Sequence, residues 1–348
     1  MSVNSFTKHE PLIFKTGSNI KLIHRAEYCK SIIADGKELI TGNERGKIRV
    51  PELNDEKVYI TFKEDVTDLS NTFWECEALT TIPENLFANN PKVIDFGSTL
   101  EGCSALKSVP ENLFANNPEV TNFYGTFQSC TSLKSIPENL FTNNPAVTSF
   151  AYTFAECRSL TSIPENLFAN NPKVTSFYGT FWKCSALKSI PENLFANNPE
   201  VTNFAYTFID CSSLTTIPEN LFAKNPAVIY FNLTFWDCTA LTSIPENLFA
   251  HNPNVISFSG TFSGCEALKS IPAGLFDNNR KVTSFSETFY GCTSLTGESP
   301  YTMIDGQKVH IYERQNYPEH FTTPTDFNYT FRYCTGLTDF AQIPFDWK

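Results

Sequence analysis

The chain has 348 residues, of which 41% are hydrophobic and 18% charged, with 32 Phe and a formal net charge of -11. This apolar content is sufficient for a continuous core and excludes general disorder. The acidic balance, without any Lys- or Arg-rich run, excludes nucleic acid and anionic membrane as partners, because both require a basic surface.

Residues 1–63 do not match the rest of the chain and predict a β-rich N-terminal cap. The segments EPLIFKT, GKIRV and KVYITFK read as short strands bounded by turn residues. A repeat array needs such a cap because its first coil otherwise exposes an apolar end and open strand edges. We therefore expect a cap at 1–63 and a repeat solenoid at 64–348.

From residue 64 onward the sequence repeats, most visibly in its cysteines. Nine cysteines lie 27 residues apart, and a tenth follows after 42 residues, which is one period plus an insertion of 15. They are Cys76, Cys103, Cys130, Cys157, Cys184, Cys211, Cys238, Cys265, Cys292 and Cys334. The spacing predicts ten stacked coils, each burying one apolar face against its neighbours.

Each 27-residue coil is predicted to contain two short strands and a helical corner. In the coil 174–200, VTSF and LKSIP read as strands separated by a tight turn at TFWKC, and PENLFAN reads as one or two helical turns. Pro191 suits the first position of a helix, and Asn198 is expected to end it as a left-handed cap. The predicted fold class is thus an α/β repeat solenoid, leucine-rich-repeat-like, with short parallel strands and short helical turns.

Two further elements are expected after the ninth coil. Asp305 and Gly306 lie between alternating apolar runs and predict a β-hairpin in an insertion at about 297–325. The tail FAQIPFDWK ends with Phe345 and Trp347, which we expect to cover the last coil as a C-terminal cap.

The pattern TFxxCxxLxxIP resembles the BspA-like leucine-rich repeats of bacterial surface proteins, and VTxF is similar to the related repeat of mycoplasma surface lipoproteins. The resemblance extends over about residues 66–340, and this chain departs from it by inserting PENLFxNNP between the two strands. It implies a protein of the bacterial cell surface or extracellular space, with its signal peptide removed, of a class implicated in adhesion. Repeat families change ligand freely, so the resemblance names no partner.

Cysteine and glutamate recur in regular columns, and this regularity favours a structural role for them over a catalytic or metal-binding one. The cysteines contain no CxxC pair and form one evenly spaced column, which favours buried free thiols over disulfides or metal ligands. A second column, formed by the Glu of each PEN segment, favours a solvated face over a calcium site, which needs oxygens from several directions. The five histidines are scattered outside any catalytic or zinc motif. We expect no enzyme activity, no cofactor, no metal and no catalytic residue.

The most informative variation in the repeat is aromatic. Immediately after the Phe of TF, some coils carry a large ring where others carry Gln, Ala, Ile or Ser, and we expect these rings to be partly exposed. They are Trp74, Trp182, Trp236 and Tyr290. Flat rings at such a turn can stack on sugar rings or anchor a protein partner.

A second aromatic set alternates its register through four adjacent coils as FYG, FAY, FYG, FAY. Its members are Tyr124, Tyr152, Tyr178 and Tyr206. A Tyr at one offset is predicted to lie over an Ala or Gly of the next coil, so that bulky rings interleave without clashing. Packing between coils and a binding face built from the same rings are both consistent with this pattern.

These observations predict a non-catalytic, adhesin-like recognition module that binds a host or community extracellular protein, or a glycan, through its repeat face. We expect a monomer, without nucleic-acid partner and without membrane insertion by this chain. The near-identity of the coils supports an alternative, a structural spacer or self-assembling surface protein. A glycan-processing enzyme would instead require clustered carboxylates in a cleft.

Overall fold

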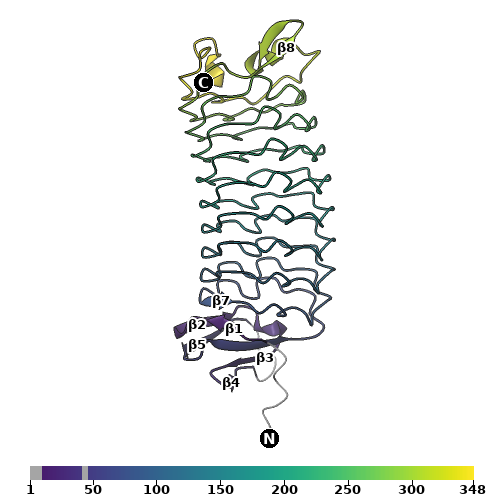
Figure 1. The fold of residues 1–348 in the computed structure, drawn as a ribbon, viewed down its shortest axis with the longest axis vertical. Coiled ribbons are helices and arrows are strands. Elements are labelled where there is room, and N and C mark those ends of the chain that lie inside the picture. Colours follow the sequence, from purple (N-terminus) through teal and green to yellow (C-terminus); the bar gives the residue numbers. More distant parts are fainter. Residues whose placement is uncertain (1–9, 41–45) are drawn as a thin grey trace. The chain divides into compact units, whose positions relative to one another are not determined.

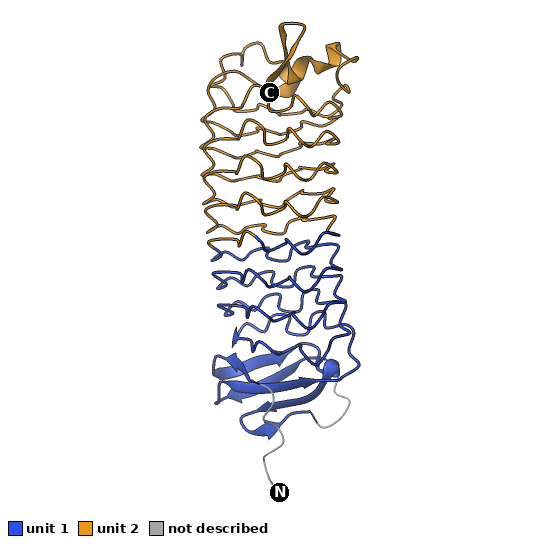
Figure 2. Cartoon of the chain, turned by 45° about the vertical axis from the view of Figure 1, so that its right-hand side comes forward, with its two compact units in different colours: residues 1–160, 166–173 blue, residues 161–165, 174–348 orange. Residues whose placement is uncertain are grey.

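The structure, a computed structural model, describes residues 10–40 and 46–348, so residues 1–9 and 41–45 of the expected cap lie outside it. The chain divides into two compact units, which Figure 2 distinguishes by colour. Unit 1 comprises residues 1–160 and 166–173, and unit 2 comprises 161–165 and 174–348. No helix within the described ranges has the length and apolarity that crossing a bilayer requires.

The amino-terminal part of unit 1 consists of antiparallel sheets (Figure 1). In the five-stranded sheet the order is β4 (Lys37–Glu38), β3 (Cys29–Ala34), β6 (Lys57–Phe62), β1 (Leu12–Phe14) and β7 (Leu79–Thr81). A second sheet pairs β2 (Gly17–Ile23) with β5 (Ile48–Leu53), and a short 3-10 helix, η1 (Ala26–Tyr28), precedes β3. Because β7 belongs to the first coil, its pairing with β1 joins the sheet directly to the repeat.

The coils are joined by parallel bridges at their third residue, counting from the Val that begins each coil. In unit 1 these bridges join Asp68, Asp95, Asn122 and Ser149 in turn, and in unit 2 they join Ser176, Asn203, Tyr230, Ser257, Ser284 and Asp326. The backbone N–H groups at positions 4, 6, 8 and 10 of one coil donate to carbonyls of the next. Tyr206 N–H, for example, donates to the Asn232 carbonyl at 2.9 Å, and Phe208 N–H to that of Thr234 at 2.9 Å.

The corners are not helical, so the predicted helix at PENLFAN is wrong. In the coil 174–200 they are successive turns, in which Leu194 N–H donates to Pro191 O at 3.4 Å and Ala196 N–H to Asn193 O at 3.0 Å. Seven residues gain too few helical bonds to offset the cost of nucleation. The LKSIP segments likewise form no strand in the described coils, except at β7 in the first.

The asparagines expected as left-handed helix caps have another role. None of them has a positive φ, and they are buried. Asn225 instead donates its side-chain amide to the carbonyls of Phe195 (3.0 Å) and Asn198 (2.9 Å) of the preceding coil. The same pair of bonds recurs in unit 1, where Asn144 donates to Phe114 and Asn117. We call this column the asparagine ladder; it satisfies corner carbonyls that a helix would have paired.

Phenylalanine rings fill the interior of both units. Phe87 and Phe114 stack at 5.9 Å in unit 1, and Phe204 and Phe231 stack at 5.8 Å in unit 2. Rings of neighbouring columns meet at a tilt, as Phe222 and Phe231 do at 4.7 Å. Offset and tilted contacts of this kind contribute about 0.5–1.5 kcal/mol per pair beyond the burial of area, so the regular spacing of Phe is itself stabilising.

The cysteine column is buried, and all eleven cysteines are free. Thiols of later coils lie against a backbone carbonyl of the preceding coil, as Cys130 Sγ does against Leu100 O at 3.2 Å. Burial raises the pKa of the Cys76 thiol to about 12. The thiols therefore act as small apolar core groups with a weak donor.

Unit 2 ends in an insertion and a tail. β8 (Tyr301–Ile304) and β9 (Gln307–His310) form a hairpin around Asp305 and Gly306, whose φ values of 49° and 81° suit a two-residue turn. The 3-10 helices η2 (Ile311–Asn316) and η3 (Phe345–Trp347) follow. From η2, Arg314 donates to the carbonyls of Phe276 (2.8 Å) and Asn279 (3.0 Å), so its guanidinium replaces the next amide of the asparagine ladder.

Candidate functional site

The tyrosine register follows from a backbone rule that the sequence alone did not reveal. The sixth residue of each coil has a positive φ, and the residues there are Asn71, Ser98, Gly125, Tyr152, Gly179, Tyr206, Leu233, Gly260, Glu287 and Tyr329. In FYG coils a glycine occupies this position without strain. In FAY coils Tyr152 (56°) and Tyr206 (65°) occupy it, which costs about 1 kcal/mol or more for a bulky residue.

The structure brings the four tyrosines together as two pairs. In unit 1 the rings of Tyr124 and Tyr152 meet edge to face at 5.5 Å, and Tyr124 is 46% exposed. In unit 2 the rings of Tyr178 and Tyr206 lie 4.8 Å apart, and both are half-buried. Burial and the neighbouring Tyr178 raise the pKa of Tyr206, so the Tyr206 hydroxyl stays neutral at physiological pH. Each pair is an amphipathic aromatic surface with polar hydroxyls.

The four aromatic residues at the ninth coil position lie in different surroundings. Trp74, Trp182, Trp236 and Tyr290 are all half-buried, whereas Ala155, Ile209 and Ser263 at this position are fully covered. The position therefore lies at the rim of the core, and only large side chains extend beyond it. Lys183 Nζ lies 4.7 Å from the Trp182 ring, and the Tyr290 ring meets that of Tyr333 at 5.4 Å.

Trp74 is held by the amino-terminal sheets. His24 meets its ring edge to face at 4.9 Å, and Lys21 Nζ lies 4.8 Å from the ring centroid. On its other side a shallow depression of about 280 Å³ is lined by Trp74, Glu75, Glu77, Glu101 and neighbouring small residues. Since the ring already carries a cation, Trp74 mainly anchors the sheets to the first coil.

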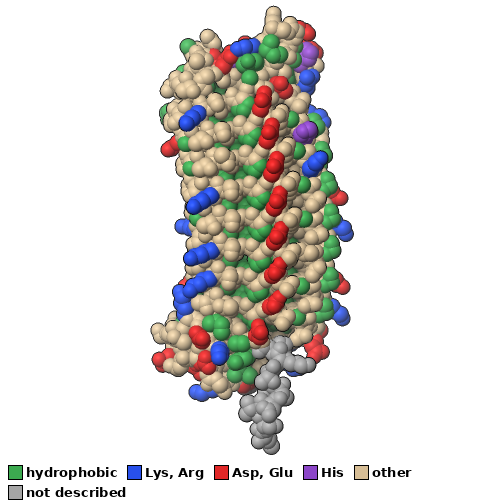
Figure 3. Space-filling model, in the orientation of Figure 1, with side chains coloured by type: hydrophobic (Ala, Val, Ile, Leu, Met, Phe, Trp, Pro, Cys, Tyr) green, Lys and Arg blue, Asp and Glu red, His purple; other side chains and the backbone are tan. Residues whose placement is uncertain are grey.

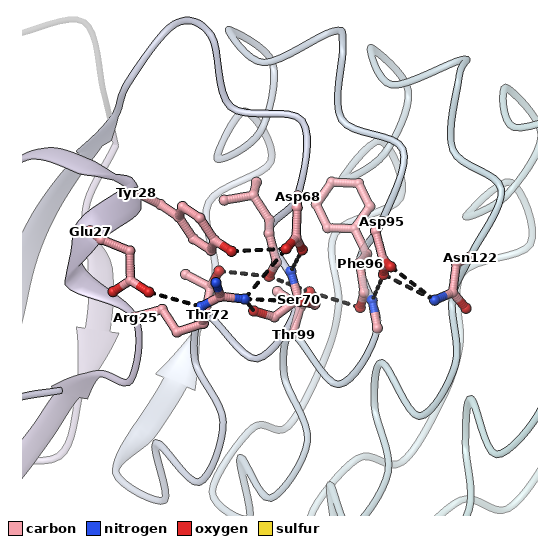
Figure 4. Close-up of polar contacts among 12 residues, drawn as sticks. Arg25, Glu27, Tyr28, Asp68, Ser70, Thr72, Asp95, Phe96, Thr99 and Asn122 are labelled. Carbon is pink, nitrogen blue, oxygen red and sulfur yellow. Dashed lines mark hydrogen bonds and ion pairs between the residues drawn. The ribbon is translucent and has the colours of Figure 1, made fainter. Parts of the chain in front are cut away.

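A polar cluster completes this junction (Figure 4). The Arg25 guanidinium donates to the Ser70 carbonyl (3.3 Å) and contacts Asp68 Oδ2 (3.4 Å). Tyr28 also donates to Asp68 Oδ2, at 2.9 Å. Burial opposes ionisation of Asp68, but the hydrogen bonds from Ser70 and Tyr28 and the charge of Arg25 hold its pKa below the usual range. These contacts serve attachment of the sheets.

An aromatic depression at the end of the last coil was not identified from the sequence. It has a volume of about 530 Å³, and its lining residues are Asn328, Tyr329, Arg332, Tyr333, Thr335, Phe340, Phe345, Asp346 and Lys348. The Arg332 guanidinium lies over the rings of Tyr329 (4.8 Å) and Tyr333 (5.1 Å). Tyr329 occupies the sixth and Arg332 the ninth coil position. Aligning the last coil with the others, with the 15-residue insertion left out, would have identified both residues.

Unit 2 also contains a buried serine, histidine and aspartate in contact. Ser299 Oγ donates to Asp339 Oδ2 at 2.5 Å, and His310 Nδ1 lies 2.8 Å from the same hydroxyl. Because the single hydroxyl proton is committed to the carboxylate, Nδ1 of His310 must be the donor in the second bond. Ser299 is fully buried and Asp339 is 4% exposed. The cluster ties the hairpin to the tail and offers no accessible nucleophile.

The column of PEN glutamates lines one face of each unit (Figure 3). From Glu84 to Glu219 each carboxylate accepts a hydrogen bond from an asparagine of the next coil, as Glu111 does from Asn139 (2.5 Å) and Glu165 from Asn193 (2.7 Å). Within the described ranges, no group of three or more His, Cys, Asp or Glu could hold a metal ion. The column links successive coils along an exposed face.

No family model matches the sequence, and no curated protein matches it. Solved structures similar to this chain include a chain of the Toll–Spatzle complex from Drosophila, with 19% identity, a TM-score of 0.39 and coverage of 74% of this chain. A leucine-rich cell surface protein from Faecalibacterium prausnitzii is 19% identical over 78% of this chain and 76% of its own, with a TM-score of 0.33. A leucine-rich repeat protein from Bacteroides ovatus is 21% identical over 71% and 73%, with a TM-score of 0.24.

This chain spans about a third, 36%, of the Toll chain that it matches. Since all three TM-scores are below 0.5, these similarities support no argument about activity or partner. The repeat solenoid itself rests on the periodic bridges and columns within each unit.

Proposed function

We propose that this protein is a non-catalytic recognition module of the bacterial cell surface or extracellular space, of the BspA-like class, which binds a protein or glycan through its tyrosine pairs. The observation that carries this proposal is the left-handed backbone of Tyr152 and Tyr206. Their backbone strain disfavours a large ring at a position that glycine fills freely in adjacent coils. Retaining half-exposed rings at that cost supports a use for them in binding.

The repeat itself supplies the residues for a test. Position 5 carries Ala in FAY coils and position 6 carries Gly in FYG coils, so both substitutions occur naturally beside each tyrosine. A fourfold variant with Tyr124→Ala, Tyr152→Gly, Tyr178→Ala and Tyr206→Gly should keep the fold and relieve strain at two positions. Binding to arrays of glycans and extracellular-matrix proteins should fall at least tenfold against the unmodified chain.

Tyr59→Ala is a matched control, because Tyr59 is 37% exposed on β6, outside the coils. Loss of binding in the fourfold variant but not in the control, with unchanged circular dichroism, would support recognition through the pairs. Equal binding by all three proteins would contradict it.

A structural spacer is the second candidate, and the near-identity of successive coils favours it. The Glu–Asn bonds between exposed corners and the asparagine ladder are repeated with little variation, as a stiff spacer would require. Absence of binding to either array would support this alternative.

A further inference from the structure

The last coil of unit 2 has backbone donors that lack a partner among the described residues. In the coil before it, Glu287 N–H donates to Asn328 O (2.9 Å) and Gly291 N–H to Arg332 O (2.9 Å). The equivalent donors of the last coil are the N–H groups of Tyr329 and Tyr333. Neither forms a hydrogen bond with any residue in the described part of the chain. Backbone donors are normally paired with protein or water, so these two are open to an acceptor from a ligand.

The tail covers only the donor between them. Phe331 N–H donates to the Trp347 carbonyl at 2.8 Å, in the place where the next coil would supply a carbonyl. Tyr329 and Tyr333 both have positive φ, at 60° and 70°, as their equivalents in earlier coils do. Because Trp347 occupies the centre of this edge, an extended peptide cannot continue the ladder across it. A compact acceptor beside the tail is the better fit.

Cationic groups accompany these donors. The Arg332 guanidinium lies over the rings of Tyr329 and Tyr333 and also interacts with the Tyr333 hydroxyl. A guanidinium has five N–H donors, so others remain for a ligand. Lys348 Nζ lies 4.8 Å from the Phe340 ring. No carboxylate of the described residues lies within ion-pair distance of Arg332 or Lys348. Asp346 also lines the depression, so it is Arg332, which has no carboxylate partner, that favours an anion beside the free N–H groups.

The walls of the depression define the rest of the ligand. Tyr329 and Tyr333 are 44% and 49% exposed, and Phe345 is 88% exposed, so flat apolar surfaces face solvent. Asn328, Thr335 and Asp346 in the lining offer groups that hydrogen-bond hydroxyls. A volume of about 530 Å³ falls within the range of small-ligand sites. Aromatic faces, hydroxyl partners and an anion site together match a sugar ring that carries a carboxylate.

We propose that the open end of the last coil binds a carboxylated sugar. The carboxylate accepts hydrogen bonds from Arg332 and from the free N–H groups of Tyr329 and Tyr333, while the sugar ring stacks on the exposed aromatic side chains. This site lies outside the tyrosine pairs and does not depend on their function.

A matched pair of oligosaccharides tests the carboxylate. A hyaluronan tetrasaccharide carries carboxylates, and chitotetraose offers similar rings without them. Titration calorimetry with the whole chain should show binding of hyaluronan at least tenfold tighter than that of chitotetraose, weakening as salt is raised. Equal affinity for both sugars, or binding of neither, would overturn the proposal.

Variants locate the site. Arg332→Gln should weaken hyaluronan binding at least tenfold, and Arg332→Lys should weaken it less. Tyr333→Gly removes a ring at a backbone position that glycine favours, so the variant should fold and bind weakly. Arg158→Gln, an equal change of charge on exposed Arg158 of unit 1, is the control.

The fourfold tyrosine variant separates this proposal from the preceding one. It should bind hyaluronan like the unmodified chain, whatever its behaviour on the arrays. Unchanged affinity in both Arg332→Gln and Tyr333→Gly would place any hyaluronan binding elsewhere and refute the site.

Discussion

The repeat is terminated differently in the two units. In unit 1 the first coil presents carbonyls towards the amino-terminal sheets, and these supply donors: His24 N–H bonds Thr72 O at 2.8 Å and the Arg25 guanidinium bonds Ser70 O at 3.3 Å. Trp74 beside them is packed under His24 and Lys21. Two sheets and a polar cluster thus cover this coil (Figure 4).

In unit 2 the last coil presents N–H groups, and a short tail supplies only the Trp347 carbonyl to them. Tyr329, Tyr333 and Phe345 remain substantially exposed. This difference shows that a terminal coil can be stabilised when only part of its edge is covered. The remainder of the edge, where it is flanked by aromatic and cationic groups, is available for a ligand.

The largest loss of stability is expected at the last coil of unit 2, because its edge is covered by a single residue of the tail, Trp347. Trp347 is 4% exposed and stacks on Phe327 at 4.7 Å. Trp347→Ala should destabilise the last coil by about 3–5 kcal/mol, because a large buried ring is lost. Hydrogen exchange of the Phe331 amide should accelerate accordingly. Phe345→Ala, which removes an exposed ring from the same tail, should change stability by less than about 0.5 kcal/mol; equal effects of the two would contradict the proposed role of Trp347.

Substitutions at the two ends of the asparagine ladder should cause the next largest loss of stability. Arg314→Met leaves the buried carbonyls of Phe276 and Asn279 without donors, which should cost about 2–4 kcal/mol. In unit 1, Asn90→Ala frees only the Lys63 carbonyl and should cost about 1–2 kcal/mol. Chemical denaturation of both variants measures the difference, with exposed Arg280→Met as control. A smaller loss for Arg314→Met than for Asn90→Ala would show that Arg314 does not terminate the ladder.

Much of the coil was predictable because its core positions repeat. Phe181, Cys184, Leu187 and Ile190 were assigned to the core from the 27-residue period, and all four are buried. The asparagines were misassigned because an Asn before Pro fits both a helix cap and a ladder. Only the fold shows that carbonyls of the preceding coil lie within reach of the amide.

The end site was hidden for a different physical reason. Backbone N–H groups belong to every residue except proline, so no side chain marks those that lack a partner. The sequence does contain Tyr329 and Arg332 at coil positions that carry aromatic residues elsewhere. Their relation to Phe345 and Lys348 depends on how the tail folds back, which no period predicts.

A smaller effect concerns the pH dependence of the amino-terminal end. Burial, assisted by the charge of Lys21, holds the pKa of His24 below its ordinary value of 6.5. The neutral imidazole is therefore favoured by folding. This stabilisation is complete above pH 6.5 and is lost as the pH falls through the lower folded-state value. His24→Gln should reduce the change in melting temperature between pH 7 and about 5. An unchanged pH dependence would exclude His24 as its source.

Asp68 should make the smallest contribution to the pH dependence of stability. It acts at lower pH than His24, and its folded-state form is the charged carboxylate and not a neutral ring. Its pKa is held below the ordinary value of 3.8, so the folded chain favours the carboxylate. That stabilisation is present above pH 3.8 and disappears as the pH falls through the folded-state value. Asp68→Asn should therefore lower stability at neutral pH and reduce its further loss in acid, measured by exchange of the Ser70 amide. If the sheets stay attached equally well in both proteins from pH 7 to 3, the polar cluster does not hold this end. Its closure would then rest on Trp74 and on the β1–β7 pairing alone.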